Sequence, residues 1–172
     1  MKNYSFVFVA LAFSFSLASF VSCKKNNGND TTLNIKLTDA PFDAQQVNVD
    51  IKEVLVNFRN DSSSWVPLQT NAKVYNLLGL QNGVDTLLAT SPVPSGTVQE
   101  LRLILGTNNS IKINNIDYPL SVASGDESGL KIKVSKKLTS SIETLVVDFD
   151  AGLSIIQTGN GTYKLKPVLK LK

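Results

Sequence analysis

The sequence predicts an all-β domain that folds as a two-layer antiparallel β-sandwich. From Leu33 onward, apolar residues recur mostly at every second position, as they do in strands with one buried face. Short clusters of glycine, asparagine, aspartate and serine separate these runs, as turns require. We expect the runs to form eight or nine strands. Because an open sheet of that length usually splits into two packed layers, a sandwich is favoured over a closed barrel.

Residues 1–22 have the three parts of a secretory signal peptide. Lys2 supplies a positive charge, residues 4–17 form an apolar run, and the small residues of ASFVS precede a cleavage site. Serines interrupt the apolar run, which makes it a poor permanent span for a hydrocarbon core of about 30 Å. We therefore expect a cleaved signal, the alternative being a retained transmembrane anchor.

Cys23 is the only cysteine and follows this segment directly. The stretch FVSC resembles the lipobox of bacterial lipoproteins. It has Phe20 where leucine is usual, a variation that resembles the lipoboxes of bacteria of the Bacteroidetes type. The resemblance implies cleavage before Cys23 and attachment of acyl chains such as palmitate, several of which anchor a protein durably. The alternative is a free or structural thiol. Residues 23–32 then form a lipidated flexible tether. We expect the protein in the cell envelope, anchored to the outer membrane, where either the periplasmic or the outer leaflet fits the sequence.

The strands follow one another along residues 33–172, the expected sandwich domain. A change of phase between Ile51 and Val54 predicts a β-bulge near residues 52–53, because a slip by one residue would otherwise turn the apolar side chains outward. Tight hairpins are expected at Asn114–Asn115 and at Asn160–Gly161. The alternating runs that contribute to the expected strands are residues 33–37, 47–51, 54–58, 65–68, 101–105, 111–113, 116–120, 130–134, 145–149, 155–156 and 163–171.

One segment, residues 74–96, departs from the alternation. Its leucines at 77, 78 and 80 are too closely spaced for a strand with one buried face. We expect one short helical turn over residues 77–81, ended by Asn82–Gly83, and then a loop stiffened by Pro92 and Pro94.

Composition excludes several classes of function. Without residues 1–22 the chain has 16 Lys and Arg against 14 Asp and Glu, too even a balance for a nucleic-acid binder. It has no histidine, so the commonest general base and every Ser-His pairing are missing. No glycine-rich phosphate loop or G-x-S-x-G motif is present. We therefore expect a protein that is not an enzyme and has no cofactor, Ca²⁺ excepted.

Several phrases in order resemble a bacterial and archaeal family known as domain of unknown function 4382. They are LTDAPFDAQQVNVDIKEVLV, WVPL, YNLLGLQNGVDTLLA, PSGTVQELRLIL, SGLKI, LVVDFDA and YKLKPVLKL. The resemblance covers residues 32–172. It implies a secreted or lipid-anchored β-sandwich of transthyretin-like (prealbumin-like) or carboxypeptidase-regulatory-like form. It carries no catalytic residue over to this chain.

Four aspartates are candidate metal ligands. Asp39 and Asp43 flank a proline turn, where a carboxylate either caps backbone N–H groups or offers oxygen to Ca²⁺. Asp148 and Asp150 lie two residues apart on one strand face, about 7 Å between Cα atoms. They either hold a cation or form ion pairs on a solvated face with lysines 131 and 133, or 164 and 166.

Three functions remain open. The first is a non-catalytic lipoprotein that binds a ligand, glycan or envelope protein, with a concave surface near residues 39–45 and 78–94. The second is a structural subunit of a fimbria-like assembly that donates its terminal strand to a neighbour. In that strand, however, Pro167 and the alternating lysines are typical of a guarded sheet edge. The third is a calcium-dependent binding module. All three functions imply membrane lipid as a partner, bound through Cys23, and none of them involves nucleic acid.

Overall fold

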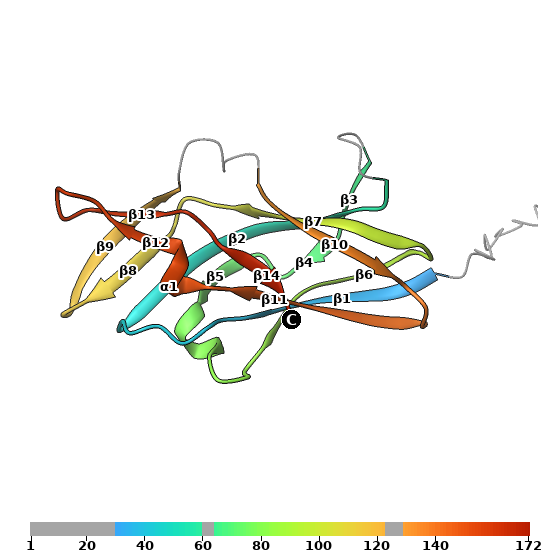
Figure 1. The fold of residues 1–172 in the computed structure, drawn as a ribbon, viewed down its shortest axis with the longest axis horizontal. Helices are drawn as coiled ribbons and strands as arrows, with labels where there is room; N and C mark the ends of the chain where they lie inside the picture. Colours follow the sequence, from blue (N-terminus) through green and yellow to red (C-terminus); the bar gives the residue numbers. More distant parts are fainter. Residues whose placement is uncertain (1–29, 60–63, 123–128) are drawn as a thin grey trace, which may run out of the picture.

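The computed structural model describes residues 30–59, 64–122 and 129–172, which form two packed β-sheets (Figure 1). The first sheet has the strand order β14–β11–β1–β6–β4. Its strands are β1 (Asp30–Thr38), β4 (Gln69–Thr70), β6 (Thr86–Pro94), β11 (Ile142–Phe149) and β14 (Leu169–Leu171).

The second sheet has the order β10–β7–β2–β8–β9–β13–β12, and two further strands pair with the long strand β2. Its strands are β2 (Gln46–Asn57), β3 (Trp65–Pro67), β5 (Lys73–Asn76), β7 (Thr97–Leu105), β8 (Ser110–Ile113), β9 (Ile116–Val122), β10 (Leu130–Lys137), β12 (Ile155–Gln157) and β13 (Tyr163–Leu165). Within the described residues, no helix has the length and hydrophobicity needed to cross a bilayer.

The predicted all-β sandwich is confirmed, but the sheets are mixed rather than purely antiparallel. Strand β1 runs parallel to β11, and β9 runs parallel to β13. These partners lie far apart in the sequence, so no hairpin turn between them reveals their direction. The described residues form fourteen strands instead of eight or nine, because five of the strands have only two or three residues, too few to show alternation.

The core between the sheets is aliphatic. Alternation along the strands buries one side chain in two, and Phe149 is the bulkiest fully buried residue. Each leucine, valine or isoleucine removed from water in this way stabilises the fold by about 1.5–3 kcal/mol. The central members of the core are Leu33, Ile35 and Leu37 of β1, Val47, Val49, Ile51, Val54 and Val56 of β2, Leu101 and Leu103 of β7, and Leu145 and Val147 of β11.

The predicted β-bulge and the hairpin at Asn114–Asn115 are confirmed, whereas the hairpin at Asn160–Gly161 has a longer loop than the tight turn predicted, since its strands last pair at Gln157 and Tyr163. The register between β2 and β7 shifts between Ile51 and Glu53, so Lys52 is the extra residue and Val54 returns to the core. Strands β8 and β9 join through Asn114–Asn115, whose φ angles of 49° and 62° suit a two-residue turn that follows the twist of the strands. Strands β12 and β13 join through a turn in which Gly161 has a φ of 70°.

The predicted helical turn is confirmed as the 3₁₀-helix η1 (Leu77–Leu80), which the Asn76 side chain caps. The expected loop over residues 84–96 was wrong, because most of it is strand β6. The N–H of Thr32 donates to the carbonyl of Ser141, the residue just before β11, at 2.8 Å. This N–H therefore points away from β6. Its partner Pro92 therefore lies in a non-hydrogen-bonded pair, where a missing N–H costs nothing on the β1 side. Strand β4 covers the other side of β6 only at residues 89–90.

The C-terminal segment divides between the two sheets. Strand β13 joins β9 and β12, and β14 joins β11 in the other sheet, with Pro167 in the crossing that separates them. Between β11 and β12 lies the one-turn helix α1 (Ala151–Ser154), which the sequence analysis did not predict. Its N-cap is Asp150, which accepts a hydrogen bond from the N–H of Leu153 at 3.1 Å.

Candidate functional site

Two of the predicted aspartates are buried next to each other. Asp39 follows β1 and is 1% exposed, and the parallel pairing sets the preceding Thr38 opposite Asp148. The Asp39 carboxylate accepts hydrogen bonds from the N–H of Ala151 (2.9 Å) and from the side chain of Gln81 (3.2 Å). Burial raises the pKa of the Asp39 carboxyl and the charge of Asp148 adds to this, while the two hydrogen bonds oppose the shift.

Asp148 is paired with lysines of the terminal strand. Its Oδ2 lies 3.3 Å from the Nζ of Lys172 and 3.4 Å from the Nζ of Lys170, because β14 pairs with β11 at this position. The expected partners were lysines of residues 131–133 or 164–166, and the expected face was solvated. Both expectations were wrong, because the terminal strand β14 pairs with β11 at Asp148, whose side chain is 1% exposed.

The four candidate carboxylates take different places in the part of the chain that the structure describes. Asp150 caps α1 and lies 3.8 Å from the Lys170 ammonium, and Asp43 is exposed on the loop after β1. In the described parts of the chain, no group of three or more His, Cys, Asp or Glu side chains is placed to hold a metal ion. The geometry of this cluster is that of caps and ion pairs that hold chain segments together.

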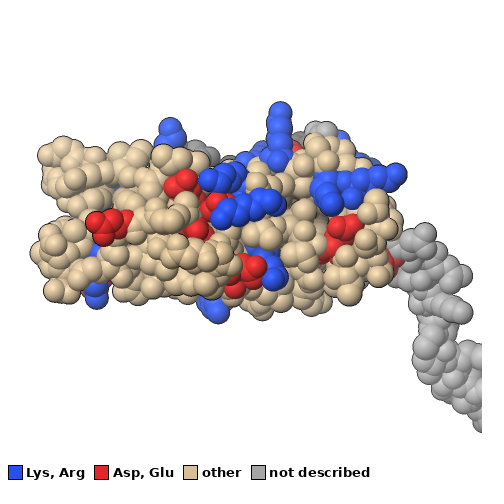
Figure 2. Space-filling view, turned by 60° about the horizontal axis from the view of Figure 1, so that its bottom comes forward, with Lys and Arg blue, Asp and Glu red and all other residues tan. Residues whose placement is uncertain are grey.

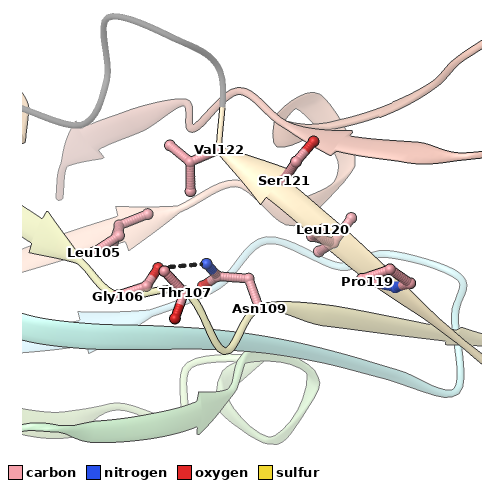
Figure 3. Close-up of a pocket in the computed structure, with 8 residues that line it drawn as sticks. All are labelled: Leu105, Gly106, Thr107, Asn109, Pro119, Leu120, Ser121 and Val122. Carbon is pink, nitrogen blue, oxygen red and sulfur yellow. Dashed lines mark hydrogen bonds between the residues drawn. The ribbon is translucent and has the colours of Figure 1, made fainter.

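A hollow of about 570 Å³ lies between the end of β7 and the end of β9 (Figure 3). We call it the β7–β9 cavity. In Figure 3, Leu105 lies on one side, the loop 106–109 forms the base, and residues 119–122 of β9 form the other side. Among the described residues, those that line it are all neutral: Leu105, Gly106, Thr107, Asn109, Pro119, Leu120, Ser121 and Val122.

A hydrogen-bond network holds the base of this cavity. Asn109 is 4% exposed, and its Oδ1 accepts the N–H of Asp50 at 2.8 Å while its Nδ2 donates to the carbonyl of Gly106 at 2.7 Å. The N–H of Gly106 donates back to the carbonyl of Asp50 at 2.7 Å. The buried Asp50 carboxylate pairs with the bulge residue Lys52 at 3.0 Å and accepts the N–H of Asn108 at 3.3 Å.

Gly106 is required by the close approach of β2. A Cβ atom at this position would overlap the Asp50 carboxylate and the Lys52 side chain. The cavity therefore has a base whose backbone is tied to β2, with apolar walls from two different strands. Such a preformed, mostly apolar hollow with a few polar groups is the usual form of a small-ligand site.

The sequence analysis did not find this cavity. The residues GTNN at 106–109 read as an ordinary turn, and the wall formed by β9 comes from a separate part of the chain. The concave surface was expected near residues 39–45 and 78–94, and none of these residues lines the β7–β9 cavity. Of them, only Pro94 lines one of the described hollows, a groove that also contains Phe58 and Trp65.

The fold and the cavity define the class of protein: an all-β sandwich with a preformed hollow between the ends of β7 and β9, two strands of one sheet. The described lining of this hollow is neutral. The chain belongs to the family described as "Domain of unknown function (DUF4382)", which it matches over residues 30–167. No curated protein and no solved structure gives a significant match. Cys23, the expected signal peptide and most of the tether lie outside the described residues.

Proposed function

We propose that this chain is a lipoprotein of the bacterial cell envelope that binds a neutral ligand without converting it. Its signal peptide, residues 1–22, is removed, and acylated Cys23 anchors the domain to the outer membrane. The β-sandwich then presents the β7–β9 cavity to an envelope molecule, such as a glycan or the segment of an envelope protein. Nucleic acid is not a partner.

The observation that carries this proposal is the chemistry of the cavity lining. The volume of about 570 Å³ falls within the range of sites that hold small molecules. The eight described lining residues offer apolar surface and a few polar groups, but no carboxylate, amine or thiol. Such a lining favours binding over acid–base or nucleophilic chemistry, and it favours an uncharged ligand, because a charge here would lose water without gaining a counter-ion.

The backbone of β9 adds polar groups to the same wall. The N–H of Leu120 donates to the carbonyl of Asn109, which shows that this residue directs its backbone toward β8. Val122, two residues on, directs its backbone to the same side. Strand β8 ends its pairing at Pro119, so within the described residues no strand pairs with this edge at Val122. A ligand with hydroxyl or amide groups on an apolar body suits this arrangement.

A neutral fluorescent probe tests the cavity. We expect N-phenyl-1-naphthylamine to bind the protein saturably at one site. Val122→Trp fills the hollow from a half-buried position on β9 and should abolish this binding. Val74→Trp places the same ring on β5, where Val74 is 43% exposed, and should leave the binding unchanged. Equal binding by both variants would show that the cavity is not the site.

A further inference from the structure

Charge is distributed unevenly along the described chain. Residues 129–172 contain eight lysines and three acidic residues, while the described residues before them contain six basic and eight acidic residues. The net charge is therefore +5 in the last 44 residues and −2 in the rest of the described chain. Asymmetry of this size points to an acidic partner for the C-terminal part.

The fold gathers most of these lysines along one border of the sandwich. Strand β10 ends the second sheet, β14 ends the first, and the two lie side by side. A register shift between Lys133 and Lys136, with Ser135 at a φ of 50°, leaves both Lys136 and Lys137 exposed. We call this border the basic edge, formed by Lys131, Lys133, Lys136, Lys137, Lys170 and Lys172.

Figure 2 shows lysine and arginine side chains gathered on one face, from its centre to the right-hand end, where β1 begins in Figure 1. Part of this charge is balanced: Lys170 and Lys172 pair with Asp148, and Lys136 lies 3.9 Å from Glu143. Within the described residues, Lys133 and Lys137 form no ion pair. Glu100 lies opposite Lys133 across the strand pair without forming an ion pair with it, so within the described residues the edge keeps lysines that are not held in ion pairs.

The basic edge ends beside the point where the chain from Cys23 enters the domain. The hydroxyl of Thr31 donates to the carbonyl of Ser140 at 3.1 Å, and residues 138–141 directly follow the lysines of β10. Seven residues of covalent chain from Cys23 to Asp30 span at most roughly 25 Å. An anchor at Cys23 thus holds this end of the domain within reach of lipid headgroups.

We propose that the basic edge docks the domain on anionic lipid headgroups of the membrane that holds its anchor. This inference rests on the proposed anchoring through Cys23 and adds an orientation to it. Each lysine close to an anionic surface increases partitioning by about fivefold, and salt weakens the attraction. Thr97 pairs with Lys137 at the docked end, and Leu105 lies eight residues further along β7, about 27 Å away. The β7–β9 cavity therefore lies at the end of the domain that is remote from the anchor.

Lysine labelling on vesicles tests the docking. The native protein is reconstituted into vesicles of phosphatidylcholine alone, or of equal parts phosphatidylcholine and phosphatidylglycerol. An amine-reactive reagent is then applied and each lysine is read by mass spectrometry. We expect labelling of Lys133 and Lys137 to fall several-fold on the anionic vesicles and to recover in high salt. Lys73 and Lys112, on strands that do not border the basic edge, should label equally on both.

A charge variant separates docking from simple crowding by the membrane. Lys133→Gln with Lys137→Gln should return the labelling of Lys131 on anionic vesicles to the level seen on neutral ones. The matched pair Lys73→Gln with Lys112→Gln should leave the protection in place. Equal labelling of Lys133 and Lys137 on both vesicles would overturn the docking.

The same experiment keeps the anchor distinct from the docking. A protein that does not float with neutral vesicles lacks the anchor, and that result contradicts the proposed lipidation. The docking is then judged by flotation of the same protein with anionic vesicles, which should be strong in low salt and lost in high salt. Absence of flotation with both vesicles would overturn both proposals.

Discussion

Replacing Asn109 by alanine should destabilise the protein by about 2–4 kcal/mol, because a buried backbone N–H and a half-buried backbone carbonyl lose their partners. The Asn109 side chain accepts the N–H of Asp50 at 2.8 Å and donates to the carbonyl of Gly106 at 2.7 Å, and Asp50 is 1% exposed. Each such group left unsatisfied costs about 1–3 kcal/mol, and water that enters from the adjacent cavity offsets part of the sum.

Urea unfolding of the wild-type protein and of Asn109→Ala measures this loss directly. Small domains have a total stability of about 5–15 kcal/mol, so the variant should still fold and its urea midpoint should fall clearly. Binding of N-phenyl-1-naphthylamine to the folded variant should also weaken, because the base of the β7–β9 cavity is no longer tied to β2.

The neighbouring Asn108→Ala is the matched control. Asn108 is exposed, and it takes part in the network through its backbone N–H, which alanine keeps. This variant should stay within about 0.5 kcal/mol of the wild type. If the two variants lose equal stability, or if Asn109→Ala loses less than Asn108→Ala, the network does not hold the loop in the way we describe.

Four further outcomes follow from the fold and the proposed anchor. Lys170→Met with Lys172→Met should lower the free energy of unfolding by about 1–3 kcal/mol, because Asp148 is then buried without a counter-ion. The loss is limited because the two lysines are half exposed and screened by solvent. Adding Asp148→Asn should recover most of it in urea unfolding. The pKa of Asp39 is raised above its ordinary 3.8 in the folded state, so its contribution to stability should improve as the pH falls through the folded pKa toward 3.8. Asp39→Asn should remove this part of the pH profile, and an unchanged profile would contradict the assignment. Calcium in excess should not raise the melting temperature relative to EGTA, because lysines already balance the charge of Asp148 and protein donors bind Asp39; a clear rise would support the calcium-dependent module. Intact-mass measurement of the native protein should find Cys23 at the N-terminus with acyl chains, and a bare, unprocessed residue would refute the anchor.

Much of the fold could be predicted because its signals are local. The alternation at Leu33, Ile35 and Leu37 reflects one buried strand face, and the phase change at Lys52 reflects one inserted residue. The turn at Asn114–Asn115 carries the residues that positive φ angles favour. Each of these features depends on neighbours within a few positions, so the printed sequence is enough to find it.

The candidate site could not be found in the same way. The strand over Pro92 and Pro94 was missed because its tolerance for proline depends on which side of β6 pairs with β1. The lysines that hold Asp148 were misassigned because β14 crosses to the other sheet. The walls of the β7–β9 cavity come from segments that carry no shared local pattern.

By itself, the sequence determined that the chain forms a sandwich of short strands with an aliphatic core, a bulge at the change of phase and turns between strands, because strand alternation and turn chemistry act over a few residues. Only the tertiary structure decided which strands run parallel, which charges meet, and where the sheet divides to leave a hollow. Those outcomes depend on contacts between segments distant in the chain, and a contact of that kind leaves no periodicity for a reader of the sequence to detect.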